Sequence, residues 1–282
     1  PTADVFFRLS ADMVDDRSNA REGHREVAPI TSGVYDTYAG ATQDNRVETS
    51  GVSFLGQWAL NDNFTFKSIS AYRAGKTDGA IDFDSLPQPY LDIPAQYRDH
   101  QFTQEFQLLF NSERLHGIAG LFYLNANAAG AFDTILGNLG VTILDAGNVE
   151  TKSYADFADA SYDVTDKLEV SVGGRWTKDD KTGTVLRSTY LGLGSPYFGN
   201  TKAIFIKPNT NYTNDRSFDQ FTPKASVSYK LTPELTTYAS YGKGFKSGGF
   251  DMRGDASLYP ATVNGYNPET VDSFEVGLKG SP

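Results

Sequence analysis

The feature that most constrains the fold is a regular alternation of short and long connections between strand-like segments. Four connections are tight and rich in turn residues, at 60–63, 111–114, 164–167 and 231–234. The connections between them, after Val14, Ala80, Ala128, Thr184 and Phe250, are expected to be long, each on the order of 15 to 35 residues. An up-and-down barrel in an outer membrane sorts its connections in this way, with short turns on one side and long loops on the other.

About ten segments are rich in the β-branched and aromatic residues that favour strands. They are Asp4–Val14, Glu48–Leu60, Asn63–Ala80, Arg98–Asn111, Leu115–Ala128, Val149–Val164, Lys167–Thr184, Phe218–Leu231, Leu235–Phe250 and Glu269–Gly280. The sequence therefore predicts an all-β fold: a transmembrane antiparallel up-and-down β-barrel, with long outer loops and short periplasmic turns.

Apolar and polar residues alternate within these segments, so that one face suits lipid and the other water. From Lys167, one face holds Leu168, Val170, Val172 and Trp176, and the other holds polar or small residues. The segments near Val52, Phe102 and Phe221 follow the same rule. Two places fit poorly, because the apolar parity slips between Phe66 and Ile69, and Asp156 interrupts an apolar face. A bulge or a shifted register would explain either.

Composition excludes several other classes of protein. The 282 residues include no cysteine, which removes disulfide frameworks and thiolate metal sites, and the net charge of −10 argues against a nucleic-acid partner. The longest apolar run, near 117–124, is far shorter than the roughly 20 residues of a membrane helix. A barrel strand needs only every second residue to be apolar, so a barrel remains compatible with this composition.

Several segments closely resemble the barrel strands of TonB-dependent outer-membrane receptors. They are TFKSISAYR at 65–73, TQEFQLL at 103–109, YDVTDKLEVSVGGRW at 162–176, ELTTYASYGKGFKSGGFD at 234–251 and YNPETVDSFEVGLKG at 266–280. The closing pair is the most specific, because a YxxYxKGFKSGG run precedes a PExxxSFExGLK run. The glycine-rich part lacks the spacing of a phosphate-binding loop and lies inside a strand.

The resemblance implies a bacterial outer-membrane receptor that binds a scarce solute with its outer loops and imports it with energy from TonB. Such receptors have a barrel of about 22 strands around a plug domain. Residues 1–282 would form a portion of the barrel domain, without the plug and with any export signal upstream. The expected partners are TonB–ExbB–ExbD, reached through the absent plug segment, outer-membrane lipid with lipopolysaccharide, and the transported siderophore–iron complex, vitamin or oligosaccharide.

Two sets of residues are candidates for contact with the solute. Aromatic rings in loops give stacking area at small entropic cost, so the ligand-binding candidates are Tyr190, Tyr197, Phe198, Tyr259 and Tyr266. Loop packing is the alternative role of these rings. By strand parity, the candidates for lining the lumen are Glu105, Arg175, Lys224 and Lys230.

No residue pattern predicts catalysis, a cofactor or a metal centre. No G-x-S-x-G nucleophile elbow occurs. Asp78, Asp82, Asp84 and Asp92 resemble calcium ligands by type but miss the EF-hand spacing, which favours a solvated acidic loop. The chain is therefore expected not to be an enzyme. The main alternative function is that of a passive outer-membrane porin; a barrel lipase and a soluble adhesin are further alternatives.

Overall fold

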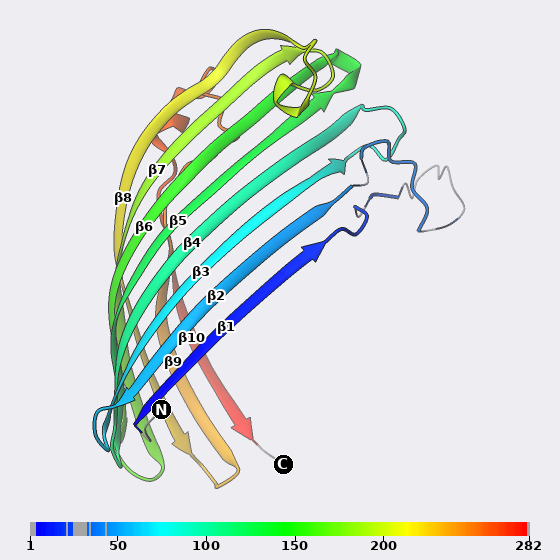
Figure 1. Ribbon diagram of the computed structural model, residues 1–282. Coiled ribbons are helices and arrows are strands. Elements are labelled where there is room, and N and C mark those ends of the chain that lie inside the picture. The colour runs from blue at the N-terminus through cyan, green and yellow to red at the C-terminus, as the bar shows by residue number, and fades with distance from the viewer. Residues whose placement is uncertain (1–3, 21, 25–32, 34, 43, 281–282) are drawn as a thin grey trace.

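The described part of the chain forms one curved antiparallel sheet in which every strand pairs with its neighbours in sequence. The computed structural model describes residues 4–20, 22–24, 33, 35–42 and 44–280. Within them the strand order is β1-β2-β3-β4-β5-β6-β7-β8-β9-β10. The sheet curls so that β9 and β10 lie behind the other strands, yet β1 and β10 do not meet (Figure 1). The architecture is a partial, unclosed barrel.

The strands and short 3₁₀ helices have the following bounds. They are β1 Val5–Asp16, β2 Arg46–Ala59, β3 Phe64–Asp82, β4 Leu91–Asn111, β5 Leu115–Leu136, η1 Gly137–Leu139, β6 Val141–Asp163, β7 Leu168–Leu191, η2 Pro196–Phe198, β8 Ile204–Lys230, β9 Leu235–Lys246, η3 Pro260–Asn264 and β10 Glu269–Gly280. Among the described residues, no helix has the length and apolar character needed to cross a membrane.

The predicted all-β, up-and-down arrangement is confirmed, but several strands run farther from the tight turns than the sequence indicates. β4 begins at Leu91 rather than Arg98, β5 continues to Leu136, and β8 begins at Ile204 rather than Phe218. The connections at 83–90, 137–140 and 192–203 are consequently shorter than expected. Polar residues continue the ladder here because pairing with a neighbouring strand outweighs their low intrinsic strand propensity.

The continuous register settles which side chains share a face. Trp176 lies opposite Asp156 on β6 and Phe221 on β8, and Asp156 lies opposite Leu121 on β5. The β3–β4 register runs from Phe64 to Asp82 without a shift, so the uneven parity of β3 reflects its composition rather than a bulge. Asp156 is a carboxylate on an otherwise apolar face.

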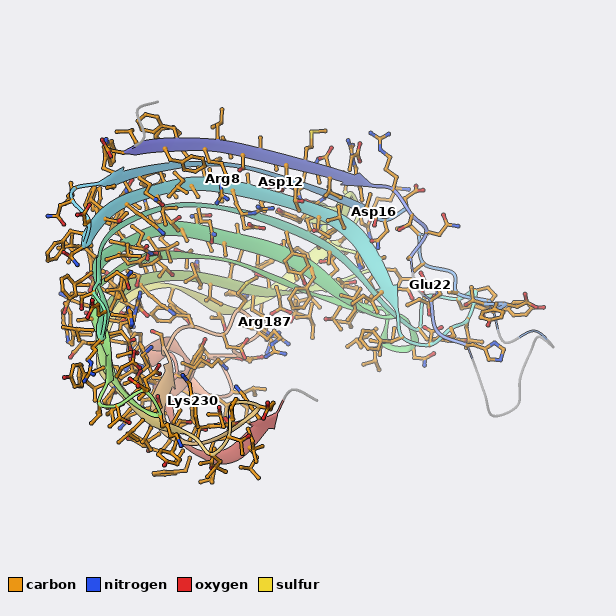
Figure 2. All side chains as sticks on the ribbon, turned by 90° about the horizontal axis from the view of Figure 1, so that it is seen from below. Arg8, Asp12, Asp16, Glu22, Arg187 and Lys230 are labelled. Atoms are coloured by element: carbon orange, nitrogen blue, oxygen red, sulfur yellow. The ribbon has the colours of Figure 1, made fainter. Side chains whose placement is uncertain are left out.

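That apolar face is the convex one. The labelled side chains of Arg8, Asp12, Arg187 and Lys230 lie inside the curve of the sheet, on the opposite face (Figure 2). On the convex side, Leu121 is 60% exposed and Val172 is 57% exposed. An exposed apolar band of this extent is stable against lipid hydrocarbon rather than against water.

Aromatic rings mark both borders of the band. Trp58, Tyr162 and Tyr229 lie close to the tight turns, and Tyr154 and Trp176 share their face farther up the strands. The segment of β7 from Leu168 to Trp176 is about nine residues long, which is close to the length that a tilted strand needs to cross a bilayer. The tight turns and the outer strand ends thus lie on opposite sides of the membrane.

Strand β8 is unusual because its outer part has no strand on one side. It pairs with β7 along most of its length but with β9 only over Lys224–Lys230. Two register shifts also interrupt the β7–β8 ladder between Arg187 and Tyr190. The free edge of β8 is contacted instead by the connection between β9 and β10: the Ser257 amide donates to the Asn209 carbonyl at 3.0 Å.

Replacing Val172 with lysine should destabilise the membrane-inserted protein by about 2–4 kcal/mol, because it places a cation in the middle of the lipid-facing band. The measurement is the unfolding free energy of the complete polypeptide in lipid vesicles, followed by denaturant titration. Ser226→Lys is the matched control, since Ser226 lies at the same depth beside Ala225 but on the concave face. Equal effects of the two substitutions would contradict the assignment of the faces.

Candidate functional site

The candidate site is the concave face together with the loop that folds onto its outer part. Residues 247–268 connect β9 to β10, and this connection, here called the inner loop, lies inside the curve of the sheet near the outer ends of the strands (Figure 1). Phe250 is 7% exposed and lies over Gly183 of β7. A Cβ at Gly183 would overlap the Phe250 ring, so glycine is needed for this close approach.

Hydrogen bonds to backbone carbonyls hold the inner loop on the strands. Lys181 Nζ donates to the Gly248 carbonyl at 2.9 Å, and Thr210 Oγ1 donates to the Gly254 carbonyl at 2.6 Å. Asn214 Nδ2 donates to the Val263 carbonyl at 2.8 Å. The concave face of β7 and β8 therefore supplies side chains that satisfy loop backbone groups, which would otherwise be costly to bury.

A buried ion pair lies beneath the inner loop. Arg187 Nη1 is 2.5 Å from Asp145 Oδ1, and the Asp145 side chain is only 1% exposed. Arg187 also lies 3.8 Å from Asp255 of the loop and donates to the Arg253 carbonyl at 3.3 Å. One guanidinium thus joins β6, β7 and the inner loop.

The titration behaviour of the groups around Arg187 follows from their burial. Burial raises the pKa of Asp145 to about 6, although Arg187 opposes the increase. In the loop, the hydrogen bond from Arg253 lowers the pKa of Asp251. For Asp255, burial acts to raise the pKa, but hydrogen bonds from Ser257 and Asn209 leave it lowered. Of these three carboxyl groups, Asp145 alone has a raised pKa.

The four predicted lumen residues lie on the concave face. Arg175 lies opposite Phe157, and Lys224 lies opposite Gly173. Both cations are on the same face of the sheet as Lys230, which is labelled in Figure 2. The Arg175 guanidinium lies 5.1 Å from the centre of the Phe122 ring, and Phe122 is opposite Glu105.

Each of these residues has a neighbouring polar or charged partner. Lys224 Nζ is 2.8 Å from Asp159 Oδ2, and Glu105 Oε1 accepts a hydrogen bond from Gln107 Nε2 at 2.6 Å. Lys230 Nζ donates to the Asp166 carbonyl at 3.4 Å beside a tight turn. The concave wall is consequently charged and hydrogen-bonded, in contrast to the apolar convex wall.

Four of the five aromatic ligand-binding candidates lie on two separate loops, whereas Tyr190, which the sequence places in a loop, belongs to strand β7. The Tyr197 and Phe198 ring centres are 5.1 Å apart in η2, and Tyr190 contacts Phe205 with ring centres 5.7 Å apart. Tyr259 and Tyr266 belong to the inner loop and are 73% and 46% exposed. No ring contact among the described residues joins the two groups.

The η2 loop lies against the convex face rather than the concave one. The Ser195 amide donates to Asp133 Oδ2 at 2.6 Å, and the Gly194 amide donates to Thr142 Oγ1 at 2.8 Å. Thr142 is opposite Tyr190, which has the same parity as Trp176 on β7. Of the five aromatic candidates, only Tyr259 and Tyr266 therefore belong to a loop on the concave side.

A hollow of about 630 Å³ lies on the convex face, and its lining includes the carboxylate of Asp156 besides the apolar side chains of Phe66, Phe106, Leu108, Leu121, Trp176 and Phe221. Its lining is part of the lipid-facing band. We therefore assign it to lipid contact and not to binding of a solute.

Comparison with known protein families decides what kind of sheet this is. The model of the family described as "TonB dependent receptor-like, beta-barrel" matches residues 4–282. The chain belongs to this family. Its members are receptors and transporters of the outer membrane of Gram-negative bacteria rather than enzymes.

Solved receptor structures have the same fold at low sequence identity. The ferric yersiniabactin uptake receptor FyuA from Yersinia pestis is 17% identical with a TM-score of 0.73, covering 100% of this chain and 41% of that one. The siderophore receptor PiuA from Acinetobacter baumannii is 15% identical, with a TM-score of 0.60 and coverage of 97% and 44%. The copper transporter OprC is 12% identical, with a TM-score of 0.64 and coverage of 100% and 41%. The chain thus spans about two-fifths of these receptors.

Acidification from pH 7 to pH 5 should hold the inner loop of this receptor chain more tightly. With the loop closed, the pKa of Asp145 is about 6, against the ordinary aspartate value of 3.8 that we take for the open loop, so the closed form binds the proton more strongly. The closed form should gain roughly 1 kcal/mol over this interval. Asp251 and Asp255 have lowered pKa values and oppose closure only below about pH 4.

A spin label tests this prediction, because the chain has no cysteine and Leu258→Cys provides a single attachment point on the inner loop. The mobile fraction of the label should fall between pH 7 and pH 5 in the complete protein. Asp145→Asn should abolish the change, since the amide does not titrate. A pH response that persists in Asp145→Asn would assign the effect to another group.

Proposed function

We propose that this chain is part of the barrel of an outer-membrane active-transport receptor, which binds a scarce solute at its outer loops and imports it in a TonB-energised manner. The observation that carries the proposal is the charged concave wall with the inner loop folded onto it, in a chain of this family. A transported solute needs such a polar path, whereas a purely structural wall does not.

The domain organisation is part of this proposal. Residues 1–282 would form a portion of the β-barrel domain, which further strands close by pairing with β1 and β10. Closure is required because lipid satisfies none of the backbone groups at an open sheet edge. A plug domain elsewhere in the polypeptide would fill the lumen and contact TonB–ExbB–ExbD. Lipid and lipopolysaccharide would surround the convex face.

Within this proposal, the candidate residues have distinct roles. Glu105, Arg175, Lys224 and Lys230 would line the lumen, along which solute and plug move. Tyr259 and Tyr266 would contact the solute from the inner loop, because both are on the concave side and their rings are accessible. Tyr190, Tyr197 and Phe198 would contact it only from the outer rim, since Tyr190 of β7 and the η2 loop both lie on the convex side.

The solute class that we propose to test first is a siderophore–iron complex. FyuA is named as a ferric yersiniabactin uptake receptor and PiuA as a siderophore receptor, which supports this order of testing. Cobalamin-like vitamins and oligosaccharides are the next classes. The family match does not favour a passive porin.

Uptake of a labelled ferric siderophore by cells that express the complete receptor should fall to background when the host lacks TonB. The reason is that transport past a plug requires energy from the inner membrane. The measurement is accumulation of radioactive iron in matched hosts with and without TonB. Receptor-dependent accumulation that is equal in the two hosts would support the porin instead.

Tyr259→Ala should weaken binding of the solute that the receptor takes up by about twofold to tenfold, as expected for loss of one aromatic contact of roughly 0.5–1.5 kcal/mol. Binding is measured to purified receptor by fluorescence quenching. Tyr229→Ala is the matched control, because Tyr229 lies on the convex face beside a tight turn. An equal loss in both variants would argue against contact with the solute at Tyr259.

A further inference from the structure

Three carboxylates converge at the outer ends of β3 and β4. Asp82 is the last residue of β3, Asp84 lies in the following connection, and Asp92 is directly opposite Asp82 in the register. One oxygen of each carboxylate lies within 4.8 Å of the others. Asp82 is 5% exposed and Asp92 is 7% exposed. This arrangement differs from the solvated acidic loop that the sequence favours.

Backbone amides satisfy two of the three carboxylates. Asp82 accepts from the amides of Ser85 at 2.6 Å, Gly40 at 2.8 Å and Ala41 at 3.2 Å. Asp84 accepts from the amides of Leu86 and Leu91 at 2.9 and 2.6 Å. Each carboxylate oxygen has two acceptor positions, so these bonds leave room for a further partner.

Asp92 has no such support. Its Oδ1 atom is buried and has no hydrogen-bond partner in the structure, and one oxygen of this carboxylate lies within 4.8 Å of oxygens of Asp82 and Asp84. Among the described residues, none of the thirteen ion pairs involves Asp82, Asp84 or Asp92. Burial, together with the negative charges of Asp82, Asp84 and Glu22, raises the pKa of Asp92 to about 6. The cluster thus gathers two buried carboxyl groups and one half-buried carboxyl group, with no ion pair to a side-chain cation among the described residues.

Such a cluster is stable when a cation neutralises it, because an unpaired buried charge is costly. Ca²⁺ binds six to eight oxygen ligands at 2.3–2.6 Å, so two oxygens bound to one ion lie at most about 5 Å apart. The observed spacing meets this limit. Mg²⁺ fits less well, since it retains several waters and uses only one or two carboxylates.

We propose that Asp82, Asp84 and Asp92 bind a calcium ion, with waters or backbone carbonyls completing its coordination. The ion would fix two connections at once. It would hold the 83–90 connection between β3 and β4, and through the Asp82 hydrogen bonds it would anchor Gly40 and Ala41 of the β1–β2 connection. A Cβ at Gly40 would overlap the Pro87 carbonyl, so the two segments are in direct contact. The site is separate from the inner loop and does not depend on the identity of the transported solute.

The test is calcium binding to the complete receptor, refolded from inclusion bodies so that no lipopolysaccharide contributes cation sites. Equilibrium dialysis with radioactive Ca²⁺ should show a site with a dissociation constant of roughly 0.1–1 mM, typical of extracellular modules. Asp92→Asn should weaken binding at least tenfold, because the amide removes a charged ligand. Asp99→Asn, an equivalent change at an exposed position of β4, should leave it unchanged.

Limited proteolysis of the 83–90 connection gives a second measurement, which can be made on Asp92→Asn even when that variant binds no Ca²⁺. Removing Ca²⁺ with a chelator should accelerate cleavage in the unsubstituted protein and have no effect in Asp92→Asn. The proposal is overturned if the unsubstituted protein binds no Ca²⁺ up to about 10 mM, ten times the weakest affinity of such modules. It is also overturned if Asp92→Asn binds as tightly, or if equimolar Mg²⁺ displaces the Ca²⁺.

Discussion

The structure depends above all on the need to satisfy every backbone hydrogen-bonding group that faces lipid. In hydrocarbon, an unpaired N–H or C=O costs several kcal/mol, and an antiparallel ladder between neighbouring strands removes this cost without water. Pairing of neighbours from β1 to β10 achieves this for the interior strands, except along the outer part of β8, which pairs with β9 only over Lys224–Lys230. The two-residue side-chain period then follows, because a paired strand in this position presents alternate residues to lipid and to the inside. The apolar convex band and the charged concave wall are two results of one backbone constraint.

Beyond the bilayer this constraint relaxes, and the buried groups change in kind. The side chains with almost no exposure include Asp133, Thr142 and Asp145 as well as Val185, and all lie toward the outer ends of the strands. Loops cover both faces of the sheet in this region: the η2 loop covers the convex side and the inner loop covers the concave side. Polar burial is feasible because loop amides and the Arg187 guanidinium provide partners. The features with chemical interest are therefore concentrated where the sheet has left the membrane.

The sequence was sufficient to predict the parts that this constraint controls. Turn residues and parity place the tight turns, and Val172 and Trp176 are correctly assigned to one apolar face. It was insufficient at the outer ends, where polar segments such as 204–217 extend β8 although their composition is typical of loops. The Asp145–Arg187–Asp255 contact joins positions far apart in sequence, and no local pattern marks it. Asp82 and Asp92 were visible as acidic residues, but their burial depends on cross-strand pairing and on contact with Gly40.

The short β8–β9 ladder has a mechanical consequence. Sheet pairing between these strands ends at Lys224 and Gly242, inside the apolar band, because Lys224 lies opposite Gly173 of β7; above that level only side chains and single amides hold the inner loop to β8. The loop could therefore swing away from the wall without breaking any interstrand bond inside the bilayer. Motion of the inner loop at the outer entrance is thereby decoupled from the β8–β9 ladder, which lies entirely below the outer border of the apolar band.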